Sequence, residues 1–423
     1  MNIGLVKPLT FRAYRSLFSA QLFSDLGNWL DFVALQVIVA YQWGLDETAI
    51  AALIFVLGVP WVIIGPFASV FVDRCNKKFV MIVCLLLRII LVGGLFIAPN
   101  LPILLILVFL KGTVAAIYDP ARQSMIRFTI PEEYLPQAVT LSQLSNNTMK
   151  ILGPALGGGI IAVFGAKSPF LFEGVGFFLA VTLLLKLPNI KEHVLNTDSI
   201  NKESIKKNDY WKELIEGIKH IVYTPKLQTA VVLSSIGFFL IFLYDGLLVF
   251  IAQNLGFSQG NFGLLISAVG LGSVIGSILL GNWTGWKSKP LQIMSVAFLL
   301  SGFFIIVMGL GDMGVVTLPL IGWCLGAFIL GLMGSGESVP YSYLLQSETP
   351  KHMMGRVSAV ATAFQTISML IAPAIGSLFA KLIGASIILL AAGGATWLMG
   401  VIVLLFIVKR INHSKKIKGE FNN

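Results

Sequence analysis

Long apolar stretches constrain the fold of this chain of 423 residues more than any other feature. Twelve of them are each long enough to cross a bilayer as a helix, which needs roughly 20 residues. They lie at about residues 14–41, 48–72, 79–98, 101–120, 137–164, 168–187, 227–252, 261–285, 290–311, 315–343, 356–380 and 385–408. Only 12% of the residues are charged, whereas a soluble domain has about 25%. Because a helix satisfies its own backbone hydrogen bonds in lipid, the sequence predicts an all-α polytopic membrane protein with 12 transmembrane helices.

The positive charges are distributed unevenly along the chain. With the N-terminus placed inside, almost all of the 30 lysines and arginines, Arg122 among them, fall in cytoplasmic segments. The exceptions are Lys167 and Lys381 on the opposite side and Arg88, Lys111 and Lys150 within spans. This bias follows the positive-inside rule and predicts that both termini are cytoplasmic. It also accounts for the net charge of +10 without a nucleic-acid partner.

A polar stretch at about residues 189–225 separates six spans from six. Its first part is predicted to be a linker. Its second part, DYWKELIEGIKHIVY, is predicted to be an amphipathic helix on the inner membrane face. The predicted domains are a six-helix bundle at 1–188, this cytoplasmic linker at 189–225, a second six-helix bundle at 226–410 and a basic cytoplasmic tail at 411–423.

The two halves contain a repeated segment. PEEYLPQAVTLSQLSNNTMKILGPALGG begins at Pro131, and PKHMMGRVSAVATAFQTISMLIAPAIGS begins at Pro350. A second proline follows 23 residues later in each copy, at Pro154 and Pro373. Internal repeats of this kind are typical of secondary transporters, in which two bundles move around a site near the midplane. The sequence therefore predicts two pseudo-symmetric bundles.

The first span contains QLFSDLGNWLDFVALQ at residues 21–36. On a helix at 100° per residue, its polar side chains fall within an arc of about 140°. This face includes Gln21, Asp25, Asn28 and Asp31. Because an ionised carboxylate in a membrane costs at least ~2.5 kcal/mol on insertion scales, the face is expected to line a wet cavity or a protein interior. We interpret Asp25 and Asp31 as functional residues.

Further charged residues lie inside other spans. Asp25, Lys111 and Lys150 are all expected near mid-membrane, where an acidic–basic cluster could load a proton in one conformation and release it in another. Desolvation favours the neutral carboxyl and a nearby cation favours the carboxylate, so alternating exposure would alternate the two effects. Arg88 and Glu173 are interpreted as structural groups that hold helices together.

Two acidic residues of the second half fit either a structural or a functional role. They are Asp245 and Glu337, and Glu337 lies where glycines and Pro340 are expected to break or bend span 10. The candidate substrate and proton site comprises Gln21, Asp25, Asn28, Asp31, Lys111, Lys150, Asp245 and Glu337.

The loop between spans 2 and 3 reads SVFVDRCNKKFVM at residues 69–81. It resembles the loop signature of the major facilitator superfamily, in which Asp-Arg is followed by a basic pair. Two glycines usual in that pattern are replaced, by Ser69 and Asn76. The resemblance implies an inner gating loop that comprises Asp73, Arg74, Lys77 and Lys78. The alternative is a basic turn that only obeys the positive-inside rule.

Span 5 carries ILGPALGGG at residues 151–159, which resembles the exporter-type motif of the same superfamily. The implied helix-bend motif comprises Gly153, Pro154, Gly157 and Gly158. The alternative is ordinary close packing of small residues. The opening FRAYRSLFSAQLFSDLGNWLDFVAL and the DPAR segment of span 4 resemble the drug:proton antiporter-like branch, which includes macrolide efflux proteins and siderophore exporters. Lys111 lies near the position of a buried arginine that is implicated in proton coupling in that branch.

The resemblance implies a proton-coupled exporter of a medium-sized amphipathic molecule, such as a macrolide-like drug or a siderophore. Such a protein would work by alternating access, as a monomer, in the bacterial plasma (inner) membrane. Two alternatives stay open: a lysophospholipid flippase-type member of the same fold, and a non-transporting receptor or scaffold. An enzyme is not expected, and neither is a cofactor, because the sequence has no metal-ligand cluster or phosphate-binding loop and its four histidines fall outside the spans.

Overall fold

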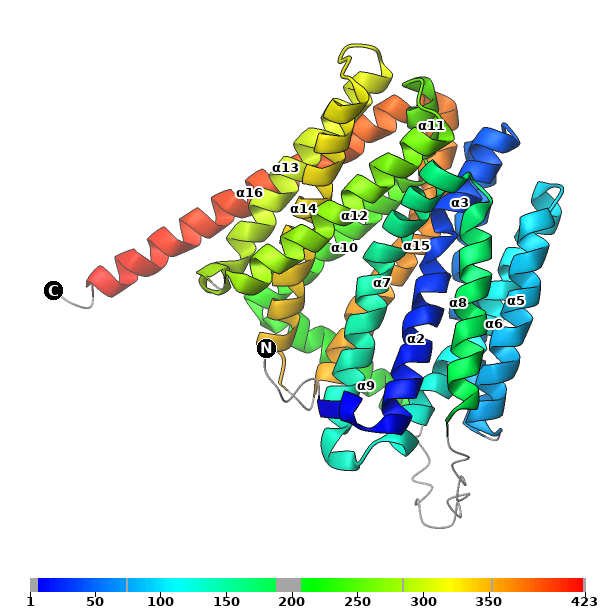
Figure 1. Cartoon of the computed structure of the whole chain (residues 1–423). Coiled ribbons are helices and arrows are strands. Elements are labelled where there is room, and N and C mark those ends of the chain that lie inside the picture. Colours follow the sequence, from blue (N-terminus) through cyan, green and yellow to red (C-terminus); the bar gives the residue numbers. More distant parts are fainter. Residues whose placement is uncertain (1–6, 74, 188–206, 284, 351–352, 421–423) are drawn as a thin grey trace. The chain divides into compact units, whose positions relative to one another are not determined.

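The computed structural model describes residues 7–73, 75–187, 207–283, 285–350 and 353–420. Within these ranges, 12 helices are long and apolar enough to cross a membrane, which confirms the predicted spans (Figure 1). The chain divides into two compact units. Unit 1 comprises Met1–Asn201 and Phe257–Ser267, and unit 2 comprises Lys202–Gly256 and Ala268–Asn423.

Unit 1 is built from seven main helical elements and three short ones. They are η1 (Lys7–Thr10), α2 (Arg12–Leu30), α3 (Phe32–Val37), η2 (Ile38–Gln42), α4 (Glu47–Asp73), α5 (Lys77–Ile97), α6 (Leu101–Thr129), η3 (Glu132–Tyr134), α7 (Leu135–Phe164) and α8 (Ser168–Leu185). The helix α2 packs between α7 and α8, while α5 packs on α6 and α8 (Figure 1). This arrangement surrounds the polar face of α2 with protein.

The first span is not one regular helix. The α-helix α2 ends at Leu30, Asp31 lies at the junction, and α3 continues from Phe32. The span then passes into a π-helical turn, η2. Irregular turns of this kind occur often at functional sites. The predicted single helix is therefore interrupted at one of its two aspartates.

Helices α4, α6 and α7 of unit 1 continue through interior prolines, which in α4 are Pro60 and Pro66. The helix α7 includes Pro154, and α6 includes Pro120 and ends at Thr129, beyond the predicted end of span 4. This length corrects the prediction that Arg122 belongs to the cytoplasmic loop charges. Arg122 lies inside α6 and its side chain is buried.

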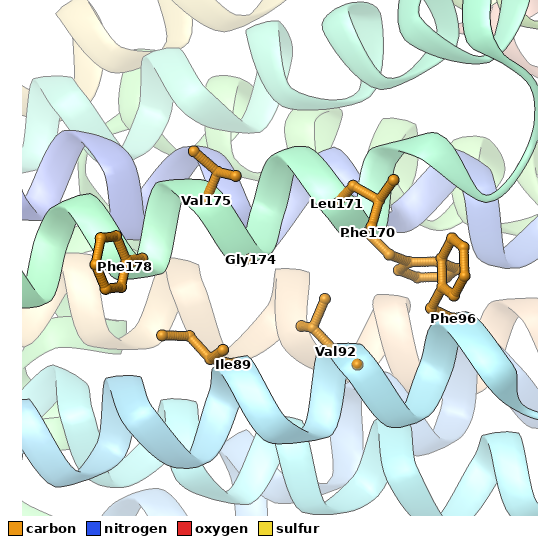
Figure 2. Close-up of a pocket in the computed structure, with 9 residues that line it drawn as sticks. Ile89, Val92, Phe96, Phe170, Leu171, Gly174, Val175 and Phe178 are labelled. Carbon is orange, nitrogen blue, oxygen red and sulfur yellow. The ribbon is translucent and has the colours of Figure 1, made fainter.

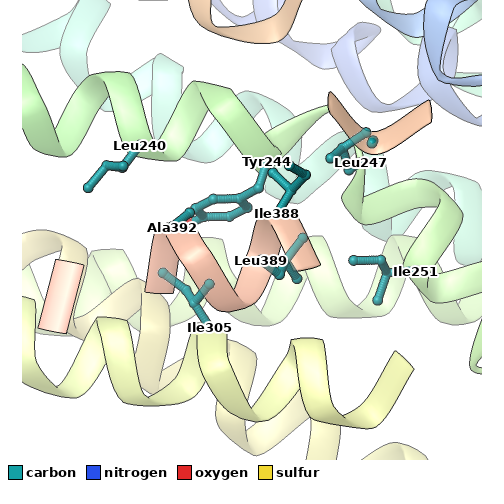
Figure 3. Close-up of a cluster of buried hydrophobic side chains, with 9 residues drawn as sticks. Leu240, Tyr244, Leu247, Ile251, Ile305, Ile388, Leu389 and Ala392 are labelled. Atoms are coloured by element: carbon teal, nitrogen blue, oxygen red, sulfur yellow. The ribbon is translucent and has the colours of Figure 1, made fainter. Parts of the chain in front are cut away.

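Unit 2 contains eight helices, with one further short turn. They are α9 (Lys207–Tyr223), α10 (Pro225–Asp245), α11 (Leu248–Asn254), most of α12 (Gln259–Asn282), η4 (Gly285–Ser288), α13 (Pro290–Asp312), α14 (Leu320–Ser347), α15 (Met354–Ile383) and α16 (Ala385–Glu420). One apolar cluster joins α10, α11, α13, α15 and α16 around Tyr244, Ile305 and Leu389 (Figure 3). It forms part of the interior of this bundle.

The structure adds detail to two expectations about unit 2. The sequence predicts a break or bend in span 10 near Glu337, and α14 runs as one α-helix through Pro340 to Ser347, so the span is not broken there. Residues 411–420 of the predicted tail are helical and continue α16. The interior proline of α14 is tolerated in a spanning helix because neighbouring groups can satisfy the backbone carbonyl that it leaves without a donor.

The helix α9 follows the predicted linker, of which residues 189–206 lie outside the described residues. Within unit 2 it packs against α15 and α10. Arg356 of α15 forms an ion pair with Glu216 of α9. The ring Nε2 atom of His220 lies 2.9 Å from the carbonyl oxygen of Glu348. These contacts attach α9 to the helix ends of unit 2.

Candidate functional site

Four buried charged side chains lie close enough inside unit 1 for their charges to interact, and we call them the charge cluster: Asp31, Arg88, Lys111 and Glu173. The Nζ atom of Lys111 donates to Oε1 of Glu173 at 2.7 Å and also to Oδ2 of Asp31. No member of the cluster is more than 5% exposed. Lys111 of α6 therefore joins the junction between α2 and α3 to α8.

Arg88 of α5 is the second cation of the charge cluster, and it is fully buried. One of its terminal nitrogens donates to the hydroxyl of Ser24 at 3.2 Å, and the other donates to the side-chain oxygen of Asn28. The guanidinium carbon lies 4.0 Å from the ring centroid of Phe177, in cation–π geometry. Arg88 thus attaches α5 to the polar face of α2 through neutral partners.

The charge cluster is balanced when all of its members are ionised, because two cations face two carboxylates. Its hydrogen bonding is nevertheless incomplete. Among the described residues, neither the Nε atom of Arg88 nor the Oε2 atom of Glu173 has a hydrogen-bond partner. A buried acceptor without a donor carries a free-energy cost of about 1–3 kcal/mol. The free oxygen of Glu173 is therefore a position where a proton can be accommodated.

A second polar group, which we call the hydrogen-bond chain, links α2 to α7 and α6. Gln21 donates to Oδ2 of Asp25 at 2.8 Å, and the hydroxyl of Ser142 donates to Oε1 of Gln21 at 2.8 Å. Arg122 donates to the Ser142 hydroxyl and pairs with Asp119. The side chain of Asp119 is 27% exposed, whereas Asp25 is only 3% exposed. The chain therefore runs from a partly exposed carboxylate to a buried one.

The three residues that are expected from the sequence to form one mid-membrane cluster form no ion pair with one another in the described part of the chain, although Lys150 lies close enough to Asp25 for their charges to interact. Lys111 pairs with Asp31 and Glu173 and not with Asp25. Ser145 donates to Asp25 at 3.1 Å, and among the described residues no lysine or arginine forms an ion pair with this aspartate. The side chain of Lys150 is exposed, with Nζ 6.0 Å from the ring centroid of Trp29. Residues at the same membrane depth on different helices need not pair, because depth does not fix the direction in which a side chain points.

Two of the predicted site residues belong to unit 2. Asp245 ends α10 and is half-buried. Glu337 of α14 is also half-buried and accepts a hydrogen bond of 3.0 Å from the hydroxyl of Ser301. Within the described part of the chain, neither carboxylate forms an ion pair.

The expected gating loop is only partly described. Arg74 and the side chain of Asp73 lie outside the described residues. Lys78 donates to the carbonyl oxygen of Leu187 at 2.6 Å, just beyond the end of α8. A cation at the C-terminal end of a helix is favourable because it interacts with the last carbonyls. Asn76, which replaces a usual glycine, caps α5 by accepting from the backbone N–H of Phe79 at 2.9 Å.

The glycines of the helix-bend motif permit close helix contact. A Cβ atom at Gly153 would overlap Trp29, and one at Gly157 would overlap the carbonyl oxygen of Leu30. Gly158 faces Gly263, in the segment of α12 that belongs to unit 1. The motif therefore brings α7 against the last turn of α2, directly before Asp31. The structure thus shows the close packing of small residues that was the alternative interpretation of this motif.

Comparison with known proteins identifies the family. A sequence profile of the Major Facilitator Superfamily matches residues 17–373 and 242–422. The chain belongs to the major facilitator superfamily. An uncharacterized MFS-type transporter, YfiS of Bacillus subtilis (strain 168), is 26% identical over 419 residues, which cover 97% of each chain. The enterobactin exporter EntS of Shigella flexneri is 25% identical over 433 residues, which cover 97% of this chain and 94% of EntS.

Solved structures of other transporters share the fold of this superfamily member. A POT family transporter in complex with a thioalcohol-conjugated peptide gives a TM-score of 0.68 at 15% identity, covering 94% of this chain and 96% of that one. A mutant of the nucleoside transporter NupG gives a TM-score of 0.62 at 14% identity, covering 93% and 99%. At this identity the likeness extends to the fold alone. The family match, together with the long apolar helices, shows that the chain is a multi-pass membrane transporter of this superfamily.

Sequence reasoning misses several polar residues of this transporter. Ser142 and Ser145 join α7 to the polar face of α2, and the only signal is their spacing on one side of a helix. Arg122 lies in a helix that continues through Pro120, beyond the predicted end of the span. Glu173, predicted to be structural, shares Lys111 with Asp31. Among the described residues, no group of three or more His, Cys, Asp or Glu side chains could hold a metal ion.

Proposed function

We propose that the chain is a proton-coupled exporter of a medium-sized amphipathic molecule, a siderophore or a macrolide-like drug, in the bacterial inner membrane. The full-length similarity to an enterobactin exporter supports export of a siderophore-like compound. The positive-inside bias supports cytoplasmic termini. Membership of the superfamily supports alternating access.

The observation that carries the proposal is the shared lysine of the charge cluster. Lys111 contacts two carboxylates from different helices, and all three side chains are buried. If Glu173 accepts a proton, Arg88 and Lys111 face Asp31 alone and one positive charge is left uncompensated. An uncompensated buried charge is strongly destabilising. The loaded cluster therefore favours a conformation in which these groups are hydrated, and this couples proton uptake to movement.

The hydrogen-bond chain supplies a second polar site in the same bundle. Asp25 is held by Gln21 and Ser145, so its charge is stabilised without a cation in contact. Asp25 lies on α2, and Asp31 of the charge cluster lies at the end of the same helix. We propose that protonation of the charge cluster shifts α2 and so changes the surroundings of Asp25. Asn28 would take part because its side-chain oxygen binds Arg88.

The remaining predicted residues are proposed as substrate contacts. Lys150 is exposed beside the ring of Trp29, so a cation and an aromatic face are offered together. Asp245 and Glu337 are half-buried carboxylates that no ion pair occupies within the described chain. An amphipathic substrate needs both an apolar surface and a few polar contacts.

Flux through proteoliposomes tests the proposal. The full chain would be reconstituted and offered a tris-catecholate siderophore or erythromycin, with and without an imposed pH gradient. We expect transport of at least one compound that needs the gradient and is lost in Glu173→Gln. The control Glu132→Gln, an exposed residue of η3, should transport normally.

Two outcomes would contradict the proposal. One is movement of a lysophospholipid between leaflets without a gradient and without flux of either compound, which supports a flippase. The other is a protein that moves no compound while Asp25→Asn and Asp31→Asn leave its cellular activity intact, which supports a receptor or scaffold.

A further inference from the structure

Helices α5 and α8 of unit 1 leave an apolar groove between them. The groove encloses about 360 Å³, and every residue that lines it is apolar (Figure 2). Its walls include Val92, Gly93 and Phe96 of α5 and Leu171, Gly174 and Phe178 of α8. Gly93 and Gly174 lack side chains, and a Cβ atom added at either would meet nothing within 4 Å. The two glycines therefore form an open part of the groove.

The surroundings of the groove indicate that it faces lipid. On α8, Leu171 is 56% exposed and Phe178 is 59% exposed. On α5, Ile90 follows the lining residue Ile89 in the chain and is 69% exposed. Both helices are spans, and large apolar side chains exposed along a span are solvated by acyl chains. The charged groups of the same helices, Arg88 and Glu173, point into the bundle instead and are buried.

The dimensions of the groove suit a single acyl chain. From Ile89 to Phe96, α5 rises by about 10 Å at 1.5 Å per residue. A hydrocarbon core of about 30 Å gives each leaflet about 15 Å. The groove therefore covers most of one leaflet in length. Its volume of about 360 Å³ lies at the small end of ligand sites, which are typically about 300–1,000 Å³.

One end of the groove carries a positive charge. The Nζ atom of Lys167 lies 5.7 Å from the ring centroid of Phe96, and Phe96 lines the groove. Lys167 is the residue before α8 begins, so it stands at the membrane-exit end of the helix. A lysine at the end of a spanning helix extends its ammonium group toward the membrane interface, where it can form a charge-assisted hydrogen bond with a lipid phosphate. An apolar groove of one-leaflet length with a cation at its end is complementary to an anionic phospholipid, which has an apolar chain and a negatively charged phosphate.

We propose that the α5–α8 groove is a binding site for one anionic phospholipid, with an acyl chain against Gly93 and Gly174 and the phosphate near Lys167. Such a lipid fills the space between the helices that carry Arg88 and Glu173. It therefore packs against the lipid-facing side of the two helices and does not touch the charged groups of the charge cluster.

Native mass spectrometry of the full chain tests this site. The protein would be equilibrated with equal amounts of phosphatidylglycerol and phosphatidylethanolamine that bear the same acyl chains. Gly93→Leu and Gly174→Leu fill the groove, and leucine is also a better helix former than glycine. We expect each of these two variants to lower the amount of retained phosphatidylglycerol at least about five-fold. The wild type should prefer phosphatidylglycerol over phosphatidylethanolamine by about five-fold, the effect of one basic residue. Lys167→Gln should remove this preference.

The matched control is Gly394→Leu in α16, where an added Cβ atom also meets nothing within 4 Å. It should retain lipid as the wild type does, and all variants should keep the elution profile and melting curve of a folded protein. Equal retention of phosphatidylglycerol by wild type and by both groove variants would overturn the proposal. So would a dimer that the groove variants abolish, because a second copy would then be the occupant. An unchanged headgroup preference in Lys167→Gln would overturn the role of the charge.

Discussion

The Nζ atom of Lys111 on α6 donates a hydrogen bond of 2.7 Å to Oε1 of Glu173 on α8. The same Nζ atom contacts Asp31, where the first span changes from one helix to the next. A single lysine therefore fixes the positions of three spans. Replacing Lys111 should therefore show how strongly the stability of this bundle depends on the balance of charge.

Lys111→Met should destabilise the protein strongly. The change leaves two buried carboxylates with Arg88 as the one other cation of the charge cluster, and breaking a buried ion pair in this way costs about 3–5 kcal/mol. Unfolding in mixed micelles, followed by circular dichroism, measures this loss.

The double variant Lys111→Met with Glu173→Gln should recover much of that loss. It leaves Arg88 and Asp31 as one cation and one anion, so the charge cluster is balanced again. The control is Glu132→Gln in place of Glu173→Gln. A double variant no more stable than Lys111→Met alone would show that charge balance does not govern this site.

Gly157→Ala should also destabilise unit 1. The added methyl group would overlap the carbonyl oxygen of Leu30 on α2, which cannot move without shifting the helix. Overpacking of this kind costs about 1–3 kcal/mol. Gly159→Ala on the same helix is the control, since its nearest contact would be the Ser267 hydroxyl at an ordinary 3.4 Å. Equal thermal stability of the two variants would contradict the close contact between α2 and α7.

The positions of the spans were predictable from the sequence, but the pairing of their charges was not. Length and hydropathy place each span along the chain but not its ends, since α6 continues to Thr129, and a polar arc on the first span predicts that Asp25 and Asp31 avoid lipid. Depth along a helix says nothing of the direction in which a side chain points. Asp25 and Asp31 lie about 120° apart at 100° per residue, so Asp25 meets Ser145 of α7 and Asp31 meets Lys111 of α6.

The break at Asp31 was equally hidden. No proline or glycine lies at the junction between α2 and α3, so the local sequence carries no breaking signal. The partner of Asp31, Lys111, lies 80 positions away along the chain, and such a contact follows from helix packing, which one sequence does not reveal.

Ser142→Ala should interrupt the hydrogen-bond chain. It removes the acceptor for Arg122 and the donor to Oε1 of Gln21, and both partners are buried. We expect a loss of about 1–3 kcal/mol in the free energy of unfolding, the cost of unsatisfied buried polar groups.

The control for this change is Ser19→Ala, which removes a half-buried hydroxyl from the same helix as Gln21. It should have little effect on unfolding. If Ser142→Ala were as stable as Ser19→Ala, the chain from Asp119 to Asp25 would have no energetic role.

Proton release on substrate binding tests the central claim most directly. The purified protein, in weakly buffered detergent solution with a pH-sensitive dye, would receive the siderophore or macrolide that it transports. We predict that the wild type and Glu132→Gln release protons into solution. Glu173→Gln, and the charge-balanced Lys111→Met with Glu173→Gln, should bind substrate without this release. An undiminished release from both variants would contradict the assignment of the coupling proton to the charge cluster.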